Sequence, residues 1–119
     1  MHNMSQISSR WILAFLACAL VVLVLALMPS PPQMLTTGWD KSNHLLAFSV
    51  LTWLGGKAFP RKLALVMAGL LAYGGLIEIL QSLTPTRSAE WLDLLADGVG
   101  ILLGWALIRM QGKLESDPN

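Results

Sequence analysis

Charged residues are scarce in this chain of 119 residues. Only 13% of them are Asp, Glu, Lys or Arg, whereas 55% are hydrophobic, and ordinary soluble domains carry about 25% charged residues. A soluble protein this small has a large surface for its volume and needs more polar groups to cover it. The scarcity of charge therefore indicates a membrane protein. The formal net charge of +1 gives no basic excess, so we expect no nucleic-acid partner.

Cysteine and recognised catalytic or metal-binding motifs are also lacking. The single cysteine, Cys18, excludes a disulfide framework within the chain. The acidic residues and histidines match no motif such as H-E-x-x-H, in which local spacing places two metal ligands and a base on one helix. From these spacings we predict no catalytic residue, no metal ion and no cofactor.

A long hydrophobic run is present near the N-terminus. Trp11 to Met28 are eighteen consecutive hydrophobic residues, which span about 27 Å as a helix. Arg10 precedes the run and Pro29 follows it. The run is long for the core of a signal peptide, and no convincing small-x-small cleavage site follows it. We therefore expect a transmembrane helix over residues 11–28 that is retained in the protein.

Three further segments have the length of membrane-spanning helices. They cover residues 40–59, 63–83 and 91–110, with Pro60 and Pro85 between them. Apart from Lys57 and Arg109 near their other ends, their charged, histidine and amide residues are Asp40, Lys41, Asn43, His44, Glu78, Gln81, Asp93 and Asp97. We predict an all-α fold in which residues 1–119 form a single domain, a polytopic membrane protein with a four-transmembrane-helix bundle.

Lysine and arginine are distributed unevenly between the two ends of the predicted helices. Six of the eight lie on the side that holds both chain termini, namely Arg10, Lys57, Arg61, Lys62, Arg109 and Lys113. Only Lys41 and Arg87 lie on the other side. Because short cytoplasmic flanks carry the excess of positive charge, both termini are predicted to be cytoplasmic.

This topology brings the polar residues to the outer side of the membrane. At about 100° per residue, Asp93, Asp97, Gly100 and Gly104 share one helix face, and ionisable groups that face lipid are costly. We therefore expect these faces to turn inward and to form a polar cavity open to the outside. The predicted ligand-binding residues are Lys41, His44, Glu78, Gln81, Arg87, Asp93 and Asp97.

Simpler interpretations exist for several of these residues. Lys41 suits an interfacial anchor, Gln81 suits a hydrogen bond between helices, and Asp93 suits a helix N-terminus. Gly100 and Gly104 form a small-x-x-x-small pattern, which is typical either of helix dimers or of close packing within one chain. Because they share the face of the aspartates, we expect close packing within the chain.

The polar positions also resemble, in order and spacing, the VanZ-like family of membrane proteins. The matching pieces are Asp-Lys-Ser-Asn-His at 40–44 with Phe48, Glu78-Ile-Leu-Gln81, Pro85-Thr-Arg87, Asp93-Leu-Leu-Ala-Asp97, Gly100 and Gly104. The resemblance covers residues 38–105 and departs at Asp97, where the family pattern commonly has asparagine. It implies a multi-pass protein of the bacterial cytoplasmic membrane and an envelope-associated role, since one member is associated with resistance to the glycopeptide teicoplanin.

Three classes of function are compatible with this pattern. The leading hypothesis is a protein that binds an anionic or amphipathic ligand from the outer leaflet, such as a lipid head group or a lipid-linked cell-wall precursor. A membrane enzyme acting on such a ligand is the second, with His44 and the carboxylates as acid, base or metal ligands. A structural subunit is the third. The lipid bilayer is the expected partner, and the oligomeric state is left open.

The charge distribution predicts the outcome of topology mapping. Reporter fusions at Gln33 and Ser88 should read as exported, and fusions at Arg61 and Asn119 as cytoplasmic, because the six basic residues hold their side inside. Paired alkaline phosphatase and fluorescent-protein fusions measure this directly. A cytoplasmic signal at Ser88 would contradict the four-span topology.

Overall fold

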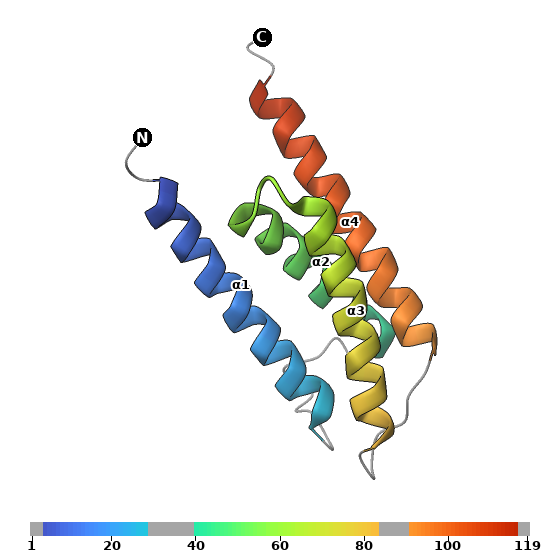
Figure 1. The fold of residues 1–119 in the computed structure, drawn as a ribbon. Coiled ribbons are helices and arrows are strands. Elements are labelled where there is room, and N and C mark those ends of the chain that lie inside the picture. Colours follow the sequence, from blue (N-terminus) through green and yellow to red (C-terminus); the bar gives the residue numbers. More distant parts are fainter. Residues whose placement is uncertain (1–3, 29–39, 84–90, 117–119) are drawn as a thin grey trace.

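The structure, a computed structural model, describes residues 4–28, 40–83 and 91–116, with the side chains of residues 9–28, 43–83 and 91–113. These residues form four α-helices, α1 (Met4–Leu27), α2 (Asp40–Ala58), α3 (Leu63–Ser82) and α4 (Trp91–Ser116) (Figure 1). No strand occurs in the described residues, so the predicted all-α fold is confirmed. α1 begins before Trp11 and α4 continues beyond Met110, because a helix can extend past its hydrophobic run into polar residues.

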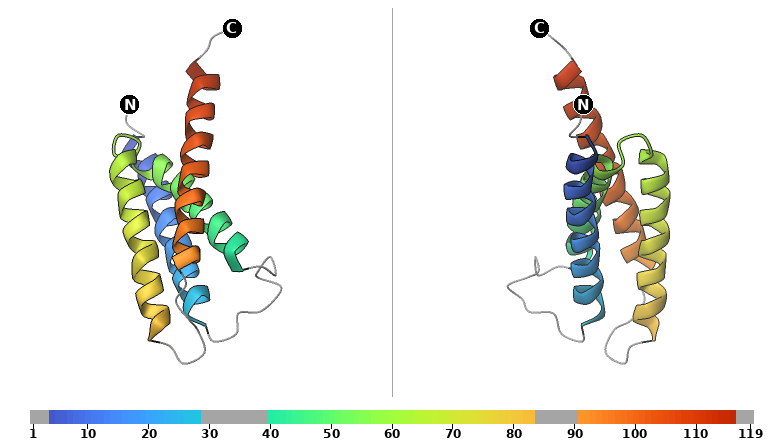
Figure 2. Two further views of the ribbon diagram at one scale, coloured as in Figure 1. Left: turned by 90° about the vertical axis from the view of Figure 1, so that its right-hand side faces the viewer. Right: turned by 60° about the vertical axis from the view of Figure 1, so that its left-hand side comes forward.

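The four helices run alternately up and down (Figure 1). α2 and α4 begin, and α1 and α3 finish, at one end of the bundle, which we call the site end. The opposite end holds the start of α1, the turn between α2 and α3, and the end of α4. α2 runs obliquely through the middle of the bundle (Figure 2). This arrangement brings the polar first turns of α2 and α4 to the same end.

Three helices in the described residues are long and apolar enough to cross a membrane. The stretches are Ser9–Leu27, Leu63–Ser82 and Trp91–Lys113. The sequence predicted four such helices, and α2 does not qualify. Its first turns carry Asp40, Lys41 and His44 and its last turn carries Lys57, which lowers its mean hydropathy. The side of the membrane that the termini face stays a prediction.

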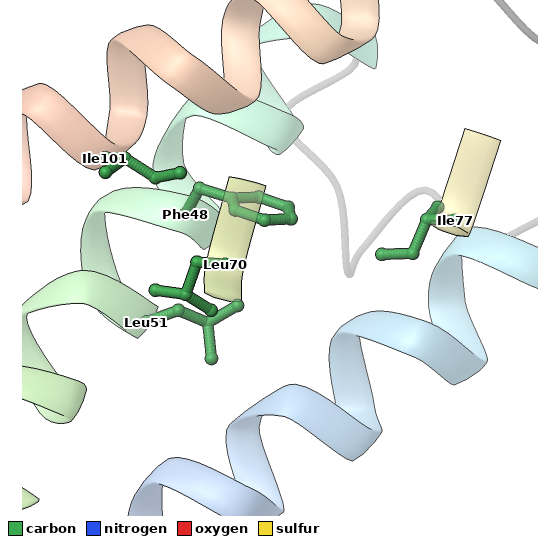
Figure 3. Close-up of a cluster of buried hydrophobic side chains, with 5 residues drawn as sticks. All are labelled: Phe48, Leu51, Leu70, Ile77 and Ile101. Atoms are coloured by element: carbon green, nitrogen blue, oxygen red, sulfur yellow. The ribbon is translucent and has the colours of Figure 1, made fainter. Parts of the chain in front are cut away.

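The apolar residues divide into a small core and a large exposed surface. Phe48, Leu51, Leu70 and Ile101 gather between α2, α3 and α4, while Ile77 lies further along α3 toward α1 (Figure 3). Many other large apolar side chains point outward, including Leu13 of α1, Leu65 of α3 and Leu102 of α4, which are 68%, 67% and 58% exposed. A soluble protein rarely exposes so much continuous apolar surface. Lipid is the environment in which this surface is stable.

Two glycines allow α4 to lie close against α2. A Cβ atom at Gly100 would overlap the backbone carbonyl oxygen of Leu45. At Gly104 it would lie 2.6 Å from Cβ of Thr52 and 2.7 Å from the carbonyl oxygen of Ser49. Both distances are shorter than van der Waals contact, so only glycine fits at either position without a backbone shift. The interpretation of these glycines as a packing surface within the chain is confirmed.

Hydrogen bonds between side chain and backbone connect α3 to α1. The Tyr73 hydroxyl donates to the carbonyl oxygen of Ala19 over 2.5 Å, and the Gln81 amide donates to the carbonyl oxygen of Ala26 over 2.9 Å. The two donors lie two turns apart on α3 and reach carbonyls two turns apart on α1. Such bonds matter in a membrane because apolar contact alone gives two helices little preference for each other over lipid.

Substitution of Gly104 tests the packing of α4 against α2. Gly104→Ala should lower the thermal midpoint of the detergent-solubilised protein by about 5 °C or more, since overpacking costs about 1–3 kcal/mol. The matched control is Gly98→Ala, because a Cβ at Gly98 meets no atom within 4 Å. Alanine favours the helix equally at both sites, so equal midpoints for the two variants would contradict the close approach.

Candidate functional site

Four ionisable side chains from three helices are buried together at the site end. They are His44 of α2, Glu78 of α3, and Asp93 and Asp97 of α4, which are 8%, 8%, 1% and 0% exposed. Few residues of this chain are charged, yet four ionisable groups lie in its interior. Burial of each costs desolvation free energy unless the group is paired or has a function. The predicted inward orientation of these residues is therefore confirmed, and we call these four residues the polar cluster.

His44 lies between the two aspartates of α4. Its Nδ1 is 2.7 Å from Oδ1 of Asp97, and its Nε2 is 3.7 Å from Oδ2 of Asp93. An ionised carboxylate only accepts hydrogen bonds, so with Asp97 ionised it is the Nδ1–H of His44 that donates in this pair. The other ring nitrogen, Nε2, faces Asp93, and only in a neutral imidazole would it act as a ligand or a base.

The local sequence explains how α4 presents both carboxylates to one histidine. Asp93 and Asp97 are four residues apart, so they lie one above the other on a single helix face. Gly100 and Gly104 continue the same face and bring it against α2. On α3, Gly74 faces Asp97, and a Cβ there would lie 2.5 Å from Oδ2 of Asp97. The missing side chain at Gly74 therefore makes room for the Asp97 carboxylate.

Glu78 completes the polar cluster from α3. One donor atom each of His44, Glu78 and Asp93 lies within 4.8 Å of the other two. These three residues could hold a metal ion, whereas the sequence spacing predicted no metal site. No local motif encodes this set, because its three members come from three different helices, but the predicted topology places all three at the same end of the bundle.

The other three predicted site residues, Gln81, Lys41 and Arg87, are not part of the polar cluster as the structure describes it. The amide nitrogen of Gln81 bonds to Ala26 of α1, so this group connects helices, as one of the two sequence interpretations proposed. Lys41 lies in the first turn of α2, but its side chain is outside the described residues. Arg87 is also outside the described residues. A polar cavity open to one side of the membrane stays a prediction.

Basic side chains lie at the end opposite the polar cluster. The Lys57 ammonium lies over the Trp53 ring, 5.3 Å from its centroid, and the Arg109 guanidinium lies over the Trp105 ring at 5.4 Å. Both contacts are cation–π interactions of the kind that anchor helix ends at a membrane interface. Among the described side chains, this end is the cationic end and the site end is the acidic one.

These features define a small all-helical protein of membrane type with a buried polar cluster. Comparison with protein families shows that residues 4–112 match the family described as VanZ/LLP1. The chain therefore belongs to this family, and the match includes α1, which the resemblance over residues 38–105 did not cover. No curated protein and no solved structure matches the chain significantly.

Filling the space at Gly74 should disturb the contact between Asp97 and His44. In Gly74→Ala the new methyl group displaces the Asp97 carboxylate, so the ring ¹⁵N resonances of His44 should change and the thermal midpoint should fall. The measurement is histidine-selective ¹⁵N NMR, in which His2 is the only other histidine. Gly75→Ala is the neighbouring control, because a Cβ there meets nothing within 4 Å. Unchanged His44 resonances in Gly74→Ala would refute the contact.

Proposed function

We propose that this VanZ-family protein is a multi-pass protein of the bacterial cytoplasmic membrane that binds the anionic head group of an envelope lipid or lipid-linked precursor. The polar cluster is the observation that carries the proposal. Three carboxylates and one imidazole from three helices are buried close to one another, so the polar cluster holds more ionisable groups than a single ion pair between helices needs. Intramembrane ionisable residues that gather in this way mark binding or transport sites more often than structural ones.

The proposal places all four helices across the membrane with both termini in the cytoplasm. α2 has 19 residues, which give about 28 Å of helix, a length within the range of transmembrane helices. Its lower mean hydropathy is compatible with a membrane because most of its described residues pack against α1, α3 and α4 and only Leu46 and Val50 of its large apolar side chains are exposed. The polar first turns of α2 and α4 then lie at the outer head-group layer, where a lipid head group can reach them.

Cations near the polar cluster are needed to attract an anionic head group. Lys41 is the second residue of α2, three residues before His44, and Arg87 precedes Asp93 by six residues, so the sequence assigns both to the site end. A guanidinium binds a phosphate or carboxylate in a bidentate manner. The carboxylates of the polar cluster compete with the ligand for these cations, which suits a reversible binding site.

A membrane enzyme that acts on the same ligand is the second candidate. The observation in its favour is the histidine between two carboxylates, with Asp97 at Nδ1 and Asp93 on the side of Nε2, since a carboxylate at one ring nitrogen makes the other a better base in the neutral imidazole. This His–Asp arrangement is the one that general-base catalysis uses. Overproduction of an enzyme would change the chemical structure of an envelope lipid, and overproduction of a binding protein would change only its amount bound.

Conservative substitution of Arg87 tests head-group binding. Arg87→Lys keeps the charge but loses the planar fork of donors, so the amount of anionic lipid that copurifies should fall about tenfold, the equivalent of one charge-assisted hydrogen bond. Quantitative lipid mass spectrometry of the purified protein measures this amount, and its membrane abundance should stay unchanged.

Arg61→Lys is the matched control for that experiment. Arg61 directly follows Pro60 in the short turn at the opposite end of the bundle and is exposed, and Arg87 comes two residues after Pro85 between α3 and α4. Lipid binding should be the same in this control as in the wild type. If Arg87→Lys binds lipid normally and Arg87→Ala only lowers abundance, the residue is a structural anchor and the proposal is wrong.

A further inference from the structure

His44, Glu78 and Asp93 have the composition of a three-residue metal site. An imidazole nitrogen and two carboxylate oxygens are the donors that catalytic zinc and related sites use, with a remaining position open to water or substrate. The three donor atoms lie within 4.8 Å of one another, and all three residues are buried. A tetrahedral ion about 2.1 Å from each donor needs donors about 3.4 Å apart, so small side-chain rotations are sufficient to close the site.

The orientation of His44 is an independent indication of metal binding. Metal-ligating histidines almost always donate their second ring N–H to a carboxylate or a carbonyl, which fixes the tautomer and makes the ligating nitrogen more basic. Asp97 occupies this position, 2.7 Å from Nδ1. The opposite nitrogen, Nε2, lies toward Asp93, 3.7 Å from Oδ2. His44 is therefore held in the orientation that a ligating histidine requires.

The electrostatics of the polar cluster also favour a divalent cation. Two carboxylates close together in a medium of low dielectric constant repel each other strongly. A divalent ion between Glu78 and Asp93 balances both negative charges and replaces the hydration that each carboxylate loses on burial. The ligands come from α2, α3 and α4, so the ion also connects the three helices that form the site end.

We propose that His44, Glu78 and Asp93 bind one divalent transition-metal ion, Zn²⁺ or Mn²⁺, and that Asp97 is a positioning residue for His44. The imidazole ligand favours these ions over Mg²⁺ and Ca²⁺, which prefer oxygen ligands alone. This inference rests on the proposed function, since the open coordination position is where a head-group phosphate would bind the ion.

The test uses the full-length protein in nanodiscs after removal of metal with a chelator. Isothermal titration with Zn²⁺, Mn²⁺ and Mg²⁺, together with elemental analysis after dialysis, should give one Zn²⁺ or Mn²⁺ per chain and at least about tenfold weaker binding of Mg²⁺. His44→Gln and Asp93→Asn should lose this stoichiometric binding. His2→Gln, which changes the only other histidine, is the matched control and should bind as the wild type does.

Asp97→Asn separates positioning from ligation. The amide keeps an oxygen acceptor near Nδ1 but loses the negative charge, so affinity should fall by about 10–100-fold while the ion stays on the same three ligands. X-ray absorption at the zinc edge, measured on wild type and Asp97→Asn, should show one imidazole nitrogen with carboxylate oxygens in both. A zinc environment without imidazole in the wild type overturns the proposal, and this measurement remains decisive if His44→Gln does not fold.

Equal Zn²⁺ binding by wild type and folded His44→Gln, or no binding of Zn²⁺ and Mn²⁺ by the wild type, also overturns the proposal. Lipid mass spectrometry on the same metal-free and metal-loaded samples separates this inference from the proposed function. Lipid that copurifies with a protein unable to bind metal refutes the metal site alone. A stoichiometric ion without any anionic lipid refutes head-group binding and leaves the metal site established.

Discussion

The close approach of α4 to α2 is the constraint on which the polar cluster depends. Helices with ordinary side chains at their contact lie about 8–10 Å apart, and Gly100 and Gly104 remove the side chains that would keep these two apart. Asp97 lies about one turn before Gly100 on the same face, so it reaches His44 directly. Larger residues at the two glycines would move the carboxylates of α4 away from the imidazole of α2.

The packing of α2 against the other three helices explains how a membrane protein tolerates the polar residues of this helix. α1, α3 and α4 carry most of the exposed apolar surface, to which α2 adds only Leu46 and Val50, and α2 runs obliquely against the other three helices. A helix that is covered by its neighbours need not be apolar on every face, because its polar residues meet protein groups rather than lipid. His44 and Thr52, which are buried on α2, are placed where a lipid-facing helix would carry leucine or valine.

The proposed metal ion explains how an acidic site can bind an anionic ligand. Three carboxylates repel an anionic head group. Lys41 and Arg87 supply only two positive charges at the site end of the bundle. A divalent ion on His44, Glu78 and Asp93 adds two more and offers an open position to a phosphate oxygen. The carboxylates then bind the metal ion, and the metal ion binds the phosphate of the head group. A site with three carboxylates is thereby compatible with an anionic ligand.

Hydropathy and helix periodicity determined much of this protein from the sequence alone. The prolines and apolar runs gave the number and order of the helices, and the cost of polar groups in lipid predicted that His44 and the aspartates face inward. The spacing of Asp93, Asp97, Gly100 and Gly104 placed them on one face, because the period of a helix is a local property. The ends of α1 and α4 were missed, since polar residues continue a helix without a hydrophobic signal.

Only the tertiary structure decided which of these faces meet. His44, Glu78 and Asp93 are distant in sequence, so their assembly into a set of metal ligands depends on how three helices pack and leaves no local spacing to detect. The same packing turned the Gln81 amide to α1, although it lies on α3 three residues from Glu78. Residues three apart on a helix point about 60° apart. This difference directs Glu78 to the polar cluster and Gln81 to α1.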